Sequence, residues 1–256
     1  MSALTRRTFI RLSVALCLLA APATASAQVR VIISGGFSAA YRELLPQFEK
    51  TTGITVTTTS GGSVGSGPNT IGGQLRRGVA ADVVILAREG LSDLIAEQRI
   101  VPGSDVDLAS SIIGMVVRAG APKPDISTVE NLKQVLLAAR SVAVSSSTSG
   151  VYLTTTLFQK LGIADQMKAK TTMAGAAAVG RGEAEIGLQQ VSEVLPIPGT
   201  LFVGTIPSEV QYVTTYAAAV VSGSSQVDAA KRLIAFLSSA EAEGAIAKSG
   251  MKPSRR

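Results

Sequence analysis

Residues 57–89 constrain the fold of this chain more than any other stretch of the sequence. A run of β-branched residues breaks into serine and glycine at Ser60, a helical segment follows around Leu75, and an apolar strand begins near Asp82. A Gly/Ser loop between a strand and a helix can present backbone N–H groups and hydroxyls to an anion. We therefore interpret this loop as one half of an anion-binding cleft.

The rest of the chain repeats the alternation of strand and helix. Apolar β-rich segments are separated by helical patterns such as residues 38–48, where Tyr41, Leu44, Leu45 and Phe48 share one face. This alternation predicts an α/β fold with mostly parallel sheets. Ligands in such folds bind at the carboxyl ends of the strands. Three polar loops fall at those ends, at residues 35–38, 60–70 and 145–152.

Composition excludes several kinds of chemistry. The sequence contains no histidine and a single cysteine, so the chain cannot build a Ser-His-Asp triad, a Cys-His dyad or a His/Cys zinc site. We therefore expect no metal and no cofactor. Nucleic-acid binding is not expected either, because the net charge of +6 is small and only 4% of residues are aromatic.

The first 27 residues are predicted to be a cleavable export signal. A basic region with Arg6, Arg7 and Arg11 precedes a short apolar run, and Ala25-Ser26-Ala27 resembles a cleavage site. The segment 5–10 resembles a twin-arginine motif, although a Sec signal with adjacent arginines remains an alternative. Cys17 lacks the preceding small residues of a lipidation site. We expect an exported, periplasmic protein whose mature part has no cysteine.

Each candidate binding residue also has an ordinary structural explanation. A Gly/Ser-rich loop such as 60–69 is usually a flexible surface loop, and its spacing matches neither a Walker A loop nor a dinucleotide fingerprint. Residues 145–150 hold more hydroxyls than helix capping requires, which favours a ligand. Arg88 follows an apolar strand directly and is a candidate partner for a carboxylate or phosphate, or else a surface arginine. Tyr152 and Gln190 are weaker candidates.

Five segments together resemble a known family. They are residues 36–40, 47–54, 60–63, 78–83 and 182–187. The chain resembles the periplasmic solute-binding proteins of ABC importers, of the type II fold that includes the molybdate-binding proteins. The resemblance implies two Rossmann-like α/β domains joined by a two-strand hinge. The first domain would comprise residues 28–110 and 215–256, and the second residues 111–214.

The resemblance also implies a ligand site between the domains and a membrane permease as partner. The residues that we expect to contact the ligand are Ser38, Gly62, Ser63, Arg88, Ser146, Ser149, Gly150, Val151, Tyr152 and Gln190. The chain departs from the molybdate binders in a longer loop at residues 64–70 and in Arg88. Both features favour an organic di- or tricarboxylate or a phosphorylated acid, with molybdate or sulfate as the rival ligands.

Three functions remain open at this point. The first is a monomeric, non-catalytic protein that captures a small anion and delivers it to a permease. The second is a sensor or surface antigen with the same fold. The third is an exported enzyme, which the absence of histidine and of catalytic spacing disfavours.

Overall fold

The computed structural model of the protein describes residues 27–254. The predicted export signal and Cys17 lie outside the described residues. The strands are β1 Gln28–Ile33, β2 Thr55–Ser60, β3 Val83–Ala87, β4 Val106–Arg118, β5 Val142–Val144, β6 Thr171–Thr172, β7 Ile186–Gln190, β8 Thr200–Thr205, β9 Val213–Val220 and β10 Lys252–Pro253. Their order across the sheet is β2-β1-β3-β9-β4-β7-β5-β6, and β8 and β10 also pair with β4.

Helices follow most of the strands. The α-helices are α1 Ser38–Thr52, α2 Ile71–Arg76, α3 Arg88–Ala96, α4 Val129–Ala138, α5 Thr148–Tyr152, α6 Phe158–Lys160, α7 Ala164–Lys168, α8 Ala177–Gly180, α9 Val191–Val194, α10 Val227–Leu237 and α11 Ala240–Lys248. Short 3-10 turns cover Gly35–Phe37 (η1) and Ser208–Val210 (η3). A π-helical turn, Leu153–Leu157, joins α5 to α6.

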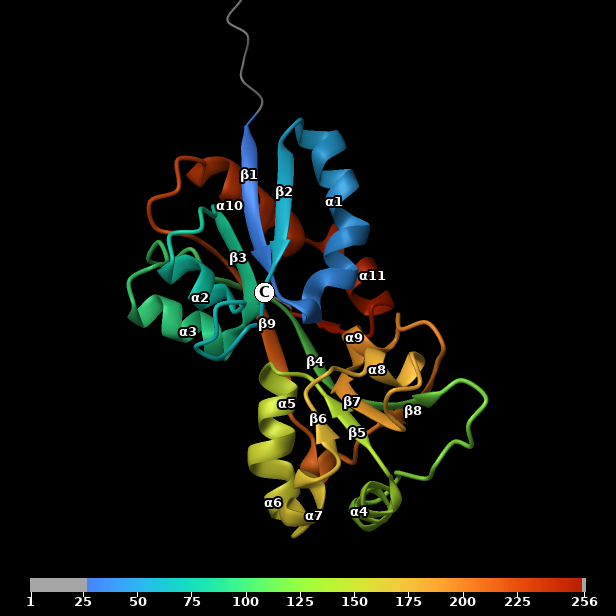
Figure 1. Ribbon diagram of the computed structural model, residues 1–256. Helices are drawn as coiled ribbons and strands as arrows, with labels where there is room; N and C mark the ends of the chain where they lie inside the picture. The colour runs from blue at the N-terminus through green and yellow to red at the C-terminus, as the bar shows by residue number, and fades with distance from the viewer. Residues whose placement is uncertain (1–26, 255–256) are drawn as a thin grey trace, which may run out of the picture.

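The long strand β4 connects two lobes (Figure 1). Its first half, up to Ile112, pairs with β9, and its second half, from Ile113, pairs with β7 and β8. We call residues 27–112 and 213–254 the first lobe and residues 113–212 the second lobe. The chain crosses between the lobes inside β4 and again in the segment 206–213. The predicted boundaries at 110 and 215 lie close to these crossings, and independent folding of each lobe stays a prediction.

Each lobe has three parallel strands and a core of its own, within one sheet that continues through β9 and β4. In the first lobe β2-β1-β3 run parallel, and in the second lobe β7-β5-β6 run parallel. Buried side chains of the first lobe gather on both sides of its sheet, around Phe48 and Leu233 on one side and Leu91 on the other. Those of the second lobe gather around Leu132 and Ala178. The predicted α/β fold is confirmed, but the sheet is mixed rather than mostly parallel, because β4 and β9 pair antiparallel with their neighbours.

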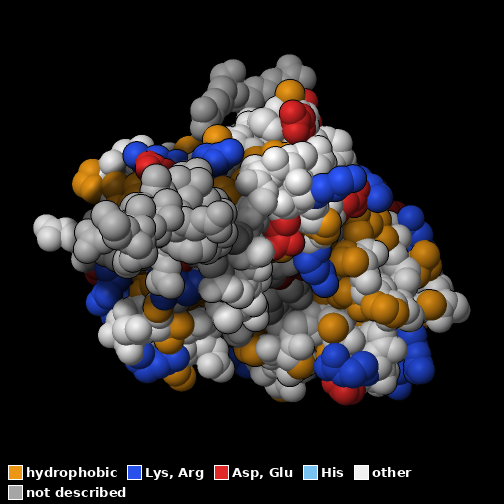
Figure 2. Space-filling view, turned by 90° about the horizontal axis from the view of Figure 1, so that it is seen from above, with side chains coloured by type: hydrophobic (Ala, Val, Ile, Leu, Met, Phe, Trp, Pro, Cys, Tyr) orange, Lys and Arg blue, Asp and Glu red, His pale blue; other side chains and the backbone are white. Residues whose placement is uncertain are grey.

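The described surface shows mixed charge. In the view from above, lysine, arginine and acidic side chains are scattered over the part of the face that the described residues form (Figure 2). Basic side chains are frequently paired with acidic ones, as in Arg76 with Glu97 and Lys248 with Glu43. Between residues 27 and 254, no helix has the length and hydropathy needed to span a bilayer.

Candidate functional site

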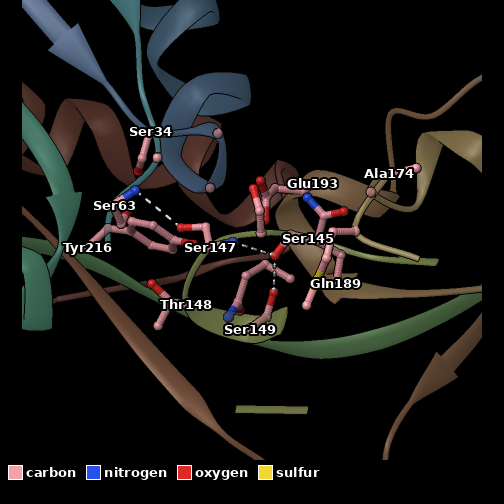
Figure 3. Close-up of a pocket in the computed structure, with 17 residues that line it drawn as sticks. Ser34, Ser63, Ser145, Ser147, Thr148, Ser149, Ala174, Gln189, Glu193 and Tyr216 are labelled. Carbon is pink, nitrogen blue, oxygen red and sulfur yellow. Dashed lines mark hydrogen bonds between the residues drawn. The ribbon is translucent and has the colours of Figure 1, made fainter. Parts of the chain in front are cut away.

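A cavity of about 260 Å³ lies between the two lobes, and residues from both lobes line it (Figure 3). It lies at the carboxyl ends of β1 and β2 in the first lobe and of β5, β6 and β7 in the second. Its volume falls just below the roughly 300–1,000 Å³ of pockets for drug-sized ligands, so it suits a small molecule. The first lobe contributes Ser34, Gly35, Gly36, Gly62, Ser63 and Tyr216. The second lobe contributes residues 145–149, residues 173–175, Gln189, Gln190 and Glu193.

Close backbone contacts shape the wall formed by the first lobe. Ser63 follows β2 and is 5% exposed, and its Oγ accepts a hydrogen bond of 3.0 Å from the N–H of Ala87 at the end of β3. A side chain at Gly90 would overlap the carbonyl of Ser63, so glycine lets the first turn of α3 pack directly against this loop. The loop that carries Ser63 is thereby held at the end of the sheet.

The wall formed by the second lobe is built around Ser145. Its Oγ accepts hydrogen bonds from the N–H groups of Ser147 and Gly150, both at 3.3 Å. A side chain at Gly150 would overlap the carbonyl of Ser145, so only glycine allows the helix to begin this close to the strand. The N–H groups in the first turn of a helix lack partners inside that helix. At Thr148 and Ser149 these donors therefore border the cavity.

The two walls meet across the cavity. The N–H of Ser63 donates to Oγ of Ser147 over 3.1 Å, and Nε2 of Gln190 donates to Oγ1 of Thr214 over 2.6 Å. At the edge of the interface, the hydroxyl of Tyr212 donates to the carboxylate of Glu89. The two lobes are therefore in direct contact in this structure.

Three buried polar atoms of the cavity lack a hydrogen-bond partner among the described residues. They are Oγ of Ser34, Oγ1 of Thr148 and Oε1 of Gln190, on side chains that are 3%, 7% and 1% exposed. A buried polar atom without a partner costs about 1–3 kcal/mol. Two of the three atoms are hydroxyls able to donate to an anion, and they come from opposite lobes. Their convergence indicates a polar ligand.

Glu193 and Tyr216 supply the titratable groups of the cavity. Burial raises the pKa of the Glu193 carboxyl to about 7, although a hydrogen bond from Gln189 opposes the increase. Burial also raises the pKa of Tyr216 well above its usual value, and the charges of Glu193 and Glu89 add to this effect. Tyr216 therefore stays a neutral hydroxyl, while Glu193 can be neutral or ionised near pH 7.

Lysine and arginine are absent from the described residues that line the cavity. An anion there would be held by hydroxyls, backbone N–H groups and helix N-termini. Within residues 27–254, no cluster of three or more His, Cys, Asp or Glu side chains is placed to hold a metal ion. The site is thus suited to a bare anion.

The structure brings half of the predicted ligand residues to the cavity. Those that line it are Gly62, Ser63, Ser146, Ser149 and Gln190. Gly150 lies directly behind them, where it permits the close packing on Ser145. All of these except Gln190, the last residue of β7, belong to the polar loops predicted at residues 60–70 and 145–152. Direct contact of each with a ligand stays a prediction.

The other four predicted residues lie off the cavity. Ser38 does not line the cavity and is not the N-cap of α1. Its hydroxyl donates a hydrogen bond to the carbonyl of Ser34. Arg88 is engaged on both sides by carboxylates: its Nη1 lies 2.6 Å from Asp105, and its Nε lies 2.9 Å from Asp107. Val151 is 45% exposed and does not line the cavity.

Tyr152 and the loop 64–70 also have structural roles. The hydroxyl of Tyr152 donates to the carbonyl of Val210, and its ring stacks on Tyr212 at 4.7 Å. The loop closes on itself through the hydrogen bond from Gly62 N–H to the carbonyl of Asn69, and its residues 64–70 do not line the cavity. The two sequence features that favoured an organic anion therefore do not act at the cavity.

Sequence reasoning missed the two titratable residues. Glu193 follows Gln189 and Gln190 at the carboxyl end of β7, and this position was the signal that could have revealed it. Tyr216 lies in the middle of the apolar strand β9, where no local pattern distinguishes it from a core residue.

Comparison with known proteins now defines the family. The sequence profile described as "Bacterial extracellular solute-binding protein" matches residues 29–252. The chain belongs to this family of solute-binding proteins. The predicted resemblance to the molybdate-binding type of solute-binding protein, with its type II periplasmic binding fold, is confirmed by the relatives below.

The relatives of this solute-binding protein carry names that describe two different activities. An aconitate isomerase of Pseudomonas sp. is 43% identical over 227 residues, which cover 87% of each chain. The molybdate-binding protein ModA of Mycobacterium bovis is 24% identical over 90% of this chain and 87% of its own. The solved periplasmic molybdate-binding protein of Azotobacter vinelandii has the same fold, with a TM-score of 0.71, 20% identity, and coverage of 89% of this chain and 100% of that chain.

Proposed function

We propose that this solute-binding protein takes a small tricarboxylate of the aconitate class into the cavity between its lobes and interconverts its isomers. The observation that carries the proposal is the cavity itself, which is lined by the unpartnered hydroxyls of Ser34 and Thr148 and by the carboxyl group of Glu193, whose pKa is raised to about 7. The 43% identity to a protein named aconitate isomerase supports the choice of ligand class.

The lining of the cavity fits an organic acid with several carboxylates. Hydroxyl and N–H donors lie on both walls, so carboxylates at the two ends of one molecule can each reach donors from a different lobe. The pKa of the Glu193 carboxyl is about 7, so both of its protonation states are populated near neutral pH. The neutral form repels an incoming carboxylate less, and the ionised form can accept a proton from the bound ligand.

Isomerisation of such a ligand needs no metal, cofactor or redox partner. An alkene next to a methylene group can shift its double bond when one proton leaves the methylene carbon and one proton returns to the former alkene carbon. The methylene protons of an aconitate are acidified by neighbouring carboxyl groups. The absence of histidine from the chain is therefore compatible with this chemistry, since a carboxyl with a pKa near 7 can serve as acid and base.

The experiment that tests the proposal measures binding and turnover together. The mature chain is titrated calorimetrically with cis-aconitate, trans-aconitate, citrate, molybdate and sulfate, and aconitate interconversion is followed by proton NMR. We expect the aconitates to bind and to interconvert. Tight binding of molybdate with no response to the aconitates would refute the proposal.

A second candidate is capture of the same anion without turnover, for delivery to a membrane permease. The match of residues 29–252 to the solute-binding family favours this candidate. Export to the periplasm, a monomeric state and the permease partner all belong to it as proposals. Binding of an aconitate with no interconversion in the NMR assay would support this candidate over the isomerase. A sensor or surface antigen would also bind without turnover, and loss of ligand uptake in cells that lack the chain separates transport from those roles.

A further inference from the structure

We infer that Glu193 is the catalytic residue that carries the proton from one carbon of the bound tricarboxylate to another, an inference that rests on the proposed isomerase activity. Glu193 lies in α9 immediately after β7, on the wall of the cavity that the second lobe forms. Figure 3 shows its side chain among the residues that converge from both lobes.

The Glu193 carboxylate reaches across to the first lobe. A side chain at Gly35 would collide with Oε1 of Glu193, so the carboxylate packs against the backbone of Gly35. A side chain at Gly36 would in the same way collide with the phenol of Tyr216. The two glycines leave space for an acid and a phenol beside the same turn. A ligand held between the lobes therefore lies within reach of both groups.

The orientation of Glu193 is held by a fixed neighbour. Gln189 donates a hydrogen bond to the Glu193 carboxylate, and Oε1 of Gln189 accepts one of 2.9 Å from the N–H of Ala176. The second bond fixes which end of the amide faces Glu193. The Gln189 amide thereby holds the Glu193 carboxylate at this wall of the cavity.

The electrostatic surroundings suit a group that must both take and return a proton. Tyr216 on β9 is the other titratable side chain that lines the cavity, and the described lining residues include no lysine or arginine that would hold Glu193 ionised. The pKa of Glu193, about 7, is consistent with this role, because an efficient general base or acid titrates near the working pH. Tyr216 stays protonated and can donate its hydroxyl to the charge that develops on the ligand.

The proposed step balances without any further reactant. The ionised Glu193 takes a proton from the methylene carbon, and the electron pair of that C–H bond delocalises over the three-carbon allyl unit and its carboxylates. The protonated Glu193 then returns the proton to the former alkene carbon. One C–H bond breaks, another forms, the double bond moves by one position, and the carboxylate of Glu193 is regenerated.

The test compares the wild-type chain with Glu193→Gln and Glu193→Asp, with Glu130→Gln as the control. Glu130 is exposed and hydrogen-bonds to Gln134 on its own helix. Calorimetry with cis- and trans-aconitate measures binding, and NMR in D2O measures interconversion and deuterium incorporation. For Glu193→Gln we expect aconitate binding within about tenfold of wild type and turnover lowered by roughly 10²–10⁴-fold. Glu193→Asp should retain partial activity, and the control should match wild type.

The outcomes separate the inference from the proposed function. If the wild-type chain interconverts the aconitates and Glu193→Gln does so at the same rate, the inference is wrong and the isomerase activity stands. If Glu193→Gln loses turnover only as far as it loses binding, Glu193 merely shapes the cavity and the inference is also wrong. If the wild-type chain binds aconitate but neither interconverts it nor incorporates deuterium, the isomerase activity and the inference both fail.

Discussion

The partly buried carboxyl of Glu193 should make a contribution to stability that falls as the pH rises. The folded state holds the pKa of Glu193 at about 7, against 4.5 in its ordinary state, so between these values the folded protein binds more protons than the unfolded chain. The stabilising contribution of Glu193 is then fully present below pH 4.5 and is lost as the pH rises through 7. At about 1.36 kcal/mol per pH unit, the difference corresponds to ~3 kcal/mol.

Urea unfolding of the wild-type chain and Glu193→Gln at pH 5.0 and about pH 8.5 measures this contribution. Glutamine can still accept the hydrogen bond from Gln189 but cannot ionise. Relative to wild type, Glu193→Gln should therefore gain ~2.5 kcal/mol of unfolding free energy between the two pH values, because part of the difference is already lost at pH 5.0. Other titrating groups affect both chains equally and cancel in the comparison. Glu130→Gln is the matched control and should follow wild type. Parallel pH profiles for wild type and Glu193→Gln would refute the reasoning.

Three further predictions concern other parts of the site and fold. Gly150→Ala should lower the free energy of unfolding by about 1–3 kcal/mol, because its methyl group overlaps the carbonyl of Ser145. Gly244→Ala lies in open space on α11 and should raise the free energy of unfolding by about 0.5–1 kcal/mol. Equal melting temperatures of the two variants would contradict this prediction. Asp82→Asn should cost about 1.5–3 kcal/mol in urea unfolding at pH 7, because it removes the charge of a buried carboxylate that accepts hydrogen bonds from the half-exposed Arg30. A loss below about 0.5 kcal/mol, on the order of an exposed ion pair, would show that the pair is not stabilising. Tyr212→Phe removes the hydrogen bond to Glu89 that joins the two lobes. The variant should release aconitate up to about tenfold faster in stopped-flow measurements. An unchanged dissociation rate would mean that this contact does not hold the lobes together.

The acid limb of the stability profile depends on Asp82. Burial raises the pKa of Asp82, but hydrogen bonds from Arg30 and Ser224 outweigh this effect and lower it below the usual 3.8. A carboxyl with a lowered pKa stabilises the folded state above its ordinary pKa and loses that contribution as the pH falls. The stabilising contribution of Glu193 is therefore lost as the pH rises, and that of Asp82 is lost as the pH falls.

Local patterns were sufficient to predict the elements and the loops that meet at the cavity. The stretch 57–89 forms strand β2, a polar loop, helix α2 and strand β3 as predicted. The loops after β1, β2 and β5 all reach the cavity, because the parallel strands of each lobe have their carboxyl ends at the cavity between the lobes. The excess of hydroxyls at residues 145–150 favoured a ligand; residues 145–149 line the cavity, and their contact with a ligand stays a prediction.

Long-range pairing could not be predicted from the same patterns. Arg88 stands at a strand end like the true lining residues, but Asp105 and Asp107 arrive from β4 and its preceding loop and neutralise it. Tyr216 reaches the cavity because β9 returns from the far end of the sequence and pairs with β3 and β4. The pKa of Glu193 depends on burial between two lobes, which composition and spacing do not express.

The return of the chain to the first lobe has a consequence for the order of folding. Strand β9 pairs with both β3 and β4, and helices α10 and α11 complete the core around Phe48 and Leu233. The second lobe is formed by one continuous segment, whereas the first lobe needs residues from both ends of the chain. A chain made from its N-terminus can therefore assemble the second lobe early, while the first lobe waits until the last 40 or so residues are available. The ligand site, which needs both lobes, forms last.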